Sequence, residues 1–250
     1  MKALHARLEG FSASFRHPLI ISGTQLSTPV PSYSNLLGMI SACAGDALGP
    51  EGTGRIGFEF KCRSHDLEIE RKDRWEVSGD RLQPVSKKKV PRVLRRLSAS
   101  VFEEMPQGVG SRQVYWEPQL DLFIENVDLL GKFVKPAATP CFGRSQDIAW
   151  IRWVRLVELE PVDTGFIGPT LIPYPQPNIP GVVLRLPEWF RNDRKGRPRR
   201  PGPFGHYQAM LPTTKEIRFH IERPDLFHPS DSDAADTANH VIYLHRWMTQ

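Results

Sequence analysis

Alternating apolar and polar residues mark several segments of the chain as β-strands. Leu4, Ala6 and Leu8 alternate with polar neighbours, the period-2 pattern of a half-buried strand. Residues 148–159 are apolar on both faces, which favours a central strand covered on both sides. The same reasoning predicts further strands at 56–60, 67–69, 75–77, 120–124, 181–186, 217–222 and 240–247.

One long helix stands out against this background. In PSYSNLLGMISACAGDALG, residues 31–49, the apolar positions recur at helical spacing. Ser32 is a candidate N-cap, and Gly45 or Gly49 a stop signal. A short second helix is predicted at about 126–133. The order strand, long uncharged loop, helix, strands is the beginning of a ferredoxin-like β-α-β-β-α-β unit, so the predicted fold class is α+β.

Two segments lack this pattern of regular strands and helices. Residues 84–100 carry six cations and no acid, and residues 161–203 hold 10 of the chain's 23 prolines and end in the basic stretch RNDRKGRPRRPGP. Proline at this density favours extended, irregular segments. We therefore expect a core over residues 1–160, with a basic insertion at about 80–113, and a Pro-rich, β-containing elaboration over 161–250.

Composition indicates a globular protein in a reducing compartment. The chain has 250 residues, 40% hydrophobic content and a net charge of +5, which fits a globular protein. Cys43, Cys62 and Cys141 are scattered, without a C-x-x-C pair, as in a reducing compartment. Residues 18–45 are uncharged but interrupted by prolines, so no membrane span is predicted. We expect a cytoplasmic protein without membrane association.

The basic cluster is the strongest signal for a ligand. Six cations without a carboxylate repel one another unless an anion is near. If all six met phosphates, nucleic-acid binding would weaken roughly a thousandfold between 50 and 200 mM salt. A solvated surface loop is the alternative. The six residues are Lys87, Lys88, Lys89, Arg92, Arg95 and Arg96.

Two further places could hold a phosphate. At the start of the predicted helix, free N–H groups favour an anion, although ordinary capping by Ser32 explains these residues equally well. In CFGRSQDIAWI, Gly143 allows close backbone approach and Arg144 offers a planar fork suited to phosphate. The alternative is a polar turn in which Arg144 pairs with Asp147.

No catalytic constellation emerges. His65-Asp66 is a lone dipeptide, and the acidic turn at 231–236 lacks the pattern of a calcium loop. P-loop, G-x-S-x-G and dinucleotide fingerprints are absent from the sequence. We predict no catalytic residue, no metal and no cofactor.

The chain resembles CRISPR-associated family five, the RAMP-type subunit that caps the crRNA 5′ end in type I Cascade complexes. FSASFRHP, STPVPSYSNLLGMISACAG and CFGRSQDIAWI carry the resemblance, over roughly residues 1–50 and 139–160. It implies a ferredoxin-like core with a protruding basic hairpin, the "thumb", at the six cations. It also implies 5′-handle contacts by Arg16, Thr28, Ser32, Ser34, Asn35, Gly143, Arg144, Ser145 and Gln146.

Three functions remain open on the sequence. The first is a non-catalytic RNA-capping subunit that ends the backbone filament and docks the large PAM-reading subunit. Its partners would be crRNA, the backbone RAMP subunit and, indirectly, target DNA, in antiviral defence or RNA-guided transposition. The second is a metal-independent endoribonuclease that processes precursor crRNA. The third is a generic RNA-binding module outside CRISPR. The GRSQDIAW form indicates the type I-B-like branch.

Overall fold

A computed structural model describes most of the chain. The described residues are 1–17, 24–78, 101–191, 200–212, 217–230 and 239–248, with only the backbone described at 71–78 and 101–108. No helix in these segments is both long and apolar enough to cross a membrane.

The first part of the chain builds the centre of a six-stranded antiparallel sheet. Its elements in chain order are β1 (Lys2–Gly10), α1 (Tyr33–Ala44), α2 (Pro50–Thr53), β3 (Ile56–Lys61), β6 (Gln119–Ile124), η2 (Val127–Leu129), α3 (Leu130–Val134) and β7 (Ala149–Ile167). Four of the strands lie in the order β7-β1-β6-β3, which places the first strand between the fourth and the third. With a helix after the first and third strands, this is the order expected of a β-α-β-β-α-β unit.

The alternation of apolar residues explains the pairing. Leu4 lies opposite Ile124 and Leu8 opposite Leu120, and Ile56 lies opposite Ile124 on the far side of β6. Their side chains form one apolar face, which α1 covers with Leu36 and other buried residues. Burying a large apolar side chain stabilises the fold by about 1.5–3 kcal/mol, so this shared face fixes the register.

The C-terminal part continues the same sheet. β13 (Phe219–Pro229) pairs with β7, and β14 (Ile242–Tyr243) pairs with β13. A second sheet has the order β8 (Leu171–Pro173), β12 (Phe204–Ala209), β9 (Val182–Pro187), and β10 (Phe190–Arg191) pairs with β11 (Arg200–Pro201). The boundary predicted at residue 160 falls inside β7, and residues from both sides of it share one core.

A buried polar cluster ties this second part to the start of α1. Glu188 accepts hydrogen bonds from Tyr207 Oη at 2.6 Å and from the backbone N–H of Met248 at 2.9 Å. His245 Nε2 lies 2.9 Å from the same carboxylate, and its ring stacks on Tyr33 at 3.9 Å. Tyr33 in turn donates to the Leu171 carbonyl, so the first turn of α1 is held by residues far along the chain.

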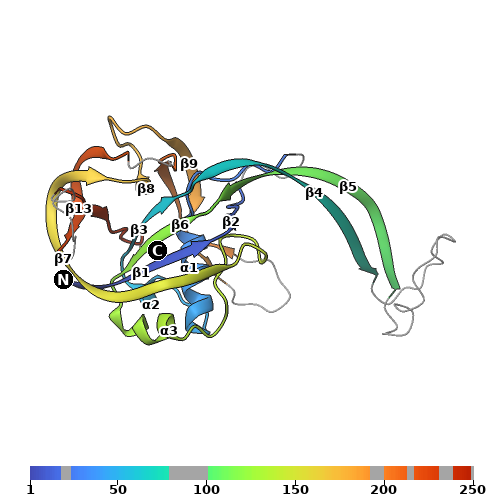
Figure 1. The fold of residues 1–250 in the computed structure, drawn as a ribbon, viewed down its shortest axis with the longest axis horizontal. Helices are drawn as coiled ribbons and strands as arrows, with labels where there is room; N and C mark the ends of the chain where they lie inside the picture. The colour runs from blue at the N-terminus through green and yellow to red at the C-terminus, as the bar shows by residue number, and fades with distance from the viewer. Residues whose placement is uncertain (18–23, 79–100, 192–199, 213–216, 231–238, 249–250) are drawn as a thin grey trace.

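A long hairpin projects from the body of the protein (Figure 1). It consists of β4 (Ser64–Ser78) and β5 (Val101–Trp116), with the short β2 (Ser12–Ala13) beside the root of β5. We call this hairpin the arm. The sequence predicted the insertion at about 80–113, but the arm already begins at Ser64, because β4 and β5 stay paired from Ser64↔Trp116 to Ser78↔Val101.

Most strand predictions agree with this structure. β9, β13 and β14 fall within or overlap the predicted segments at 181–186, 217–222 and 240–247, and η2 with α3 covers the predicted second helix. One expectation was wrong in part. The segment 148–159 is not covered on both faces along its whole length, because the side chains of Ile148, Trp150 and Leu156 are 53%, 38% and 43% exposed.

Candidate nucleic-acid interface

The GRSQD turn is a tight loop closed on itself. Phe142 N–H donates to the Asp147 carbonyl at 2.7 Å, and Asp147 N–H donates to the Arg144 carbonyl at 3.0 Å. Gly143 has φ +103°, and a Cβ at this position would collide with the Ser14 carbonyl oxygen. Glycine is therefore required here by its own backbone and by the neighbouring segment, whatever ligand the turn binds.

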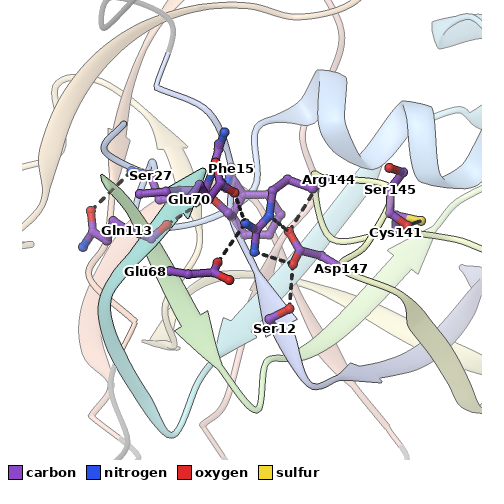
Figure 2. Close-up of polar contacts among 12 residues, drawn as sticks. Ser12, Phe15, Ser27, Glu68, Glu70, Gln113, Cys141, Arg144, Ser145 and Asp147 are labelled. Atoms are coloured by element: carbon purple, nitrogen blue, oxygen red, sulfur yellow. Dashed lines mark hydrogen bonds and ion pairs between the residues drawn. The ribbon is translucent and has the colours of Figure 1, made fainter. Parts of the chain in front are cut away.

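The guanidinium group of Arg144 donates hydrogen bonds to carboxylates within the protein. Nε and Nη2 donate to the two oxygens of Asp147 at 2.7 and 2.8 Å. Nη1 donates to Glu68 at 2.9 Å and to Glu70 at 2.5 Å. Figure 2 shows these acids surrounding the arginine, while Ser145 and Cys141 lie away from them. Four of the five N–H donors are thus used.

Burial and charge explain the protonation states. The Arg144 side chain is 13% exposed and that of Asp147 is 0% exposed. Burial alone would lower the pKa of Arg144, but its hydrogen bonds to Asp147 and Glu68 raise that pKa above the ordinary value. Burial alone would raise the pKa of Glu70, but hydrogen bonds from Arg112 and Arg144 lower it. The hydrogen bonds therefore favour the charged forms of both Arg144 and Glu70.

This geometry matches the alternative in which Arg144 pairs with Asp147. A phosphate would reach the planar fork only by displacing a carboxylate, so the structure does not present Arg144 as a free anion-binding group. Its direct contact with RNA stays a prediction. Ser145 and Gln146 are exposed on the same turn and are the side chains of the turn best placed to meet a ligand.

The cluster also fastens the arm. Glu68 and Glu70 belong to β4, and Arg112 on β5 donates to Glu70 at 3.0 Å. Ser12 in β2 donates to Asp147 at 2.6 Å. Arg144 and Asp147 thus link the turn to β4 and to β2, and Glu70 links Arg144 to β5 through Arg112. We call these six residues, Ser12, Glu68, Glu70, Arg112, Arg144 and Asp147, the root cluster.

The segment 24–28 runs beside the root of the arm. Gln25 N–H donates to the Ser111 carbonyl at 2.7 Å, and Gln113 N–H donates to the Gln25 carbonyl at 2.9 Å. Ser27 bridges to Arg16, whose side chain is exposed. Thr28 is buried and donates to the Val30 carbonyl at 2.8 Å, so its side chain serves local structure.

The start of α1 is an ordinary capping box in this structure. The Ser32 hydroxyl accepts from Asn35 N–H at 3.2 Å, and the Asn35 amide oxygen accepts from Ser32 N–H at 3.3 Å. Capping therefore explains Ser32 and Asn35 without a ligand. Ser34 differs, because it lines a groove of about 660 Å³ between α1 and the β10 segment around Phe190. The sequence did not single out this groove, and only the small residues Gly38, Ser41 and Ala42 on one face of α1 hint at it.

The predicted RNA contacts thus divide into three groups. Arg16, Ser145 and Gln146 are exposed around the root of the arm, and Ser34 is partly exposed in the α1 groove. Thr28, Ser32, Asn35, Gly143 and Arg144 have structural partners or strict packing roles. The six predicted thumb cations, Lys87 to Arg96, lie outside the described residues.

The sequence missed the acidic half of the root cluster. Glu68 and Glu70 were read only as the polar positions of an alternating strand, although the period of two does place both on one face. No group of three His, Cys, Asp or Glu side chains in the described segments is arranged to hold a metal ion.

Comparisons with known proteins identify the fold. No protein-family model matches the sequence, and no curated protein matches it. A chain of a solved CRISPR RNA-guided surveillance complex is similar in structure, with TM-score 0.50 and 15% identity over 89% of this chain and 91% of that one. The mostly-β fold with few helices is therefore shared with a subunit of such a complex.

Two further structures were found. A CRISPR protein from Archaeoglobus fulgidus has TM-score 0.47 and 11% identity, over 99% of this chain and 100% of that one. A chain of a Type III-B Cmr-β complex, solved with cognate target RNA and AMPPnP, has TM-score 0.43 and 13% identity, over 89% and 86%.

Proposed function

We propose that this protein is a non-catalytic RNA-binding subunit of a type I CRISPR Cascade complex, of the RAMP type and family five. It binds and caps the crRNA 5′ handle in the cytoplasm, ends the backbone filament and docks the large PAM-reading subunit. The protein interacts with target DNA indirectly, through the other subunits of the complex. The form of the GRSQDIAW block favours the type I-B-like branch. The fold shared with a surveillance-complex subunit supports membership.

The observation that carries the RNA role is the arm. β4 and β5 lead away from the body toward the segment between them, in which residues 84–100 hold six cations and no acid. A polyanion is the partner that such a cluster favours, since the same charges repel one another in its absence. The arm therefore acts as the basic thumb, and the exposed Arg16, Ser145 and Gln146 at its root are the nearest described candidates for handle contacts.

The root cluster has a positioning role in this proposal. Arg144 binds the turn to β4, and through Asp147 it also holds Ser12 in β2. The cluster fixes the orientation of the arm relative to the body and holds Ser145 and Gln146 beside its root. Arg144 thus affects RNA binding through the geometry of its neighbours.

The first prediction is that the purified protein binds repeat RNA and leaves it intact. The basis is that no general acid and base with defined spacing was found in the sequence. Labelled repeat RNA is incubated with the protein in EDTA and, separately, in Mg²⁺, then resolved on a denaturing gel. A gel shift with full-length RNA in both buffers is expected. Cleavage at one fixed site in EDTA, lost when a single His or Tyr is replaced, would instead establish the metal-independent endoribonuclease.

A further inference from the structure

The first half of β7 has an open outer edge. Residues 149–158 pair with β1 on one side. On the other side β13 pairs only with residues 159–167, and its last contact is the hydrogen bond from Ser230 N–H to the Glu158 carbonyl at 3.0 Å. At the opposite end Ala149 N–H donates to the Pro140 carbonyl at 2.9 Å. In between, no described strand covers this edge.

The alternation of the ladder identifies the groups that face outward. The Glu158 carbonyl points away from β1, toward Ser230, whereas Leu159 N–H donates to the Met1 carbonyl on the β1 side. In an antiparallel strand, alternate residues turn both their N–H and C=O groups to the same edge. Leu156 and Val154 therefore turn theirs outward with Glu158, and neither has a backbone partner there among the described residues.

The surroundings of this edge are apolar. A groove of about 520 Å³ lies between β7 and the segment 133–140, and all of its lining residues are uncharged. Around it, Val134 is 68% exposed, Ile148 53%, Leu156 43% and Trp150 38%. Large apolar side chains grouped beside unpaired backbone groups are typical of a surface that is covered in the working state.

The charges around the edge are mostly positive, and the one acid of the edge itself, Glu158, lies at its end and pairs with Lys2 at 3.8 Å. Between residues 129 and 157 the only acid is Asp147, which is buried against Arg144. Lys132, Lys135, Arg152 and Arg155 in the same stretch are all exposed. An occupant of this edge therefore meets cations on a basic rim and apolar side chains in the groove.

We propose that the open edge of β7 and the groove beside it bind an extended, acidic and apolar segment of a partner protein, added as a further strand. The partner's backbone pairs with Val154 and Leu156, its apolar side chains enter the groove, and its carboxylates meet Arg152 and Arg155. The proposal does not depend on the RNA role, because it uses none of the residues assigned to RNA.

Two other occupants fit less well. A second copy of this chain would place four arginines, Arg152 and Arg155 from each copy, on one short strand pair that holds only two acids, the two copies of Glu158, so its charge balance is less favourable than that of an acidic segment. A nucleic acid would satisfy the cations, but it has no row of alternating N–H and C=O groups to match the edge and no aliphatic side chains for the groove. Both are outcomes of the test below.

The second prediction tests this edge with designed peptides and the full chain. The probe is a fluorescent library of eleven-residue peptides that alternate Glu with Val, Ile, Leu or Phe. By fluorescence anisotropy it is expected to bind at least tenfold more tightly than the same library with Lys in place of Glu. It should also bind at least tenfold more tightly than the same library N-methylated at every amide, because methylation removes the donors that pair with the edge. Equal binding of the methylated library would overturn the proposal.

Two matched variants at Leu156 test whether the peptides bind at the open edge of β7. Leu156→Pro removes an outward N–H while leaving the bonds to β1 in place, and is expected to weaken peptide binding at least tenfold. Leu156→Ala keeps the N–H and should cost less than threefold. If Leu156→Pro does not fold, Arg152→Glu with Arg155→Glu must reverse the preference between the Glu and Lys libraries. Overturning results are equal peptide binding by a folded Leu156→Pro chain, an unchanged preference in the double variant, self-association that the variants abolish, or an eleven-nucleotide RNA that loses binding on Leu156→Pro.

Discussion

Replacing Arg144 with alanine is expected to lower the free energy of unfolding by about 3 kcal/mol or more. The change leaves Asp147 fully buried and Glu70 mostly buried without their shared cation. Removing one partner of a buried ion pair costs more than the pair itself contributes, because the remaining charge stays buried without its counterion. Asp147 carries most of this cost, since Glu70 keeps Arg112 at 3.0 Å. Urea or thermal denaturation followed by circular dichroism measures the loss.

Two comparisons sharpen this third prediction. Arg63 pairs with Glu117 at 2.8 Å, but both side chains are more than half exposed, so Arg63→Ala should cost at most about 0.5 kcal/mol. Arg144→Lys should recover only part of the loss, because an ammonium group cannot hold both oxygens of Asp147 and both glutamates in the same geometry. An unchanged unfolding free energy in Arg144→Ala, together with lost RNA binding, would mean that Arg144 contacts RNA directly.

The same cluster gives the protein part of its acid sensitivity. The pKa of Glu70 is lowered in the folded state from its ordinary value of 4.5. A carboxylate with a lowered folded pKa contributes stability above its unfolded pKa, and this contribution is lost as the pH falls toward the folded pKa. The stability of the wild-type protein should therefore fall below about pH 4.5, and the Arg144→Ala variant should show a smaller loss over that range.

Replacing the six thumb cations with alanine is expected to remove most of the salt dependence of RNA binding. The residues are Lys87, Lys88, Lys89, Arg92, Arg95 and Arg96. Each phosphate contact to a single strand contributes a slope of about 0.7 in log affinity against log salt, so six contribute about 4. The affinity of the wild-type protein should then fall roughly several hundredfold between 50 and 200 mM salt. That of the variant should change little.

The chain offers a matched control for this fourth prediction. Residues 191–200 also hold six basic residues, Arg191, Arg194, Lys195, Arg197, Arg199 and Arg200. Alanine at these positions removes the same charge, taking the net charge from +5 to −1 in both variants. If the thumb binds RNA, only the thumb variant should lose the steep slope. Equal losses in the two variants would mean that RNA responds to total charge rather than to the arm.

Local pattern was enough to predict the central sheet and the long helix. Leu4, Ala6 and Leu8 could be assigned to one face because a strand has a strict period of two, and the paired β6 repeats that period. The capping residue Ser32 and the left-handed Gly45 at the two ends of α1 are short-range signals, and both appear in the structure.

The partners of Arg144 were out of reach of such reasoning. Glu68 and Glu70 lie 76 and 74 residues away along the chain, and they meet Arg144 only because β4 leaves the body beside the turn. Alternation shows that the two acids share a face, but not which cation that face will meet. The open edge of β7 was hidden for a similar reason, since an apolar run reports burial of its side chains and says nothing about how far a neighbouring strand extends.

The RNA that the protein carries in the cell tests the central proposal most directly. The chain is expressed with a repeat–spacer array and the other subunits of its locus, purified through a tag on this chain, and the bound RNA is sequenced. As a fifth prediction, we expect one class of RNA whose 5′ end lies at a fixed position in the repeat, with crosslinks from that end to peptides containing Ser145 and Gln146 or the arm. Bound RNA with scattered 5′ ends and no enrichment of repeat sequence would contradict a role in capping the crRNA.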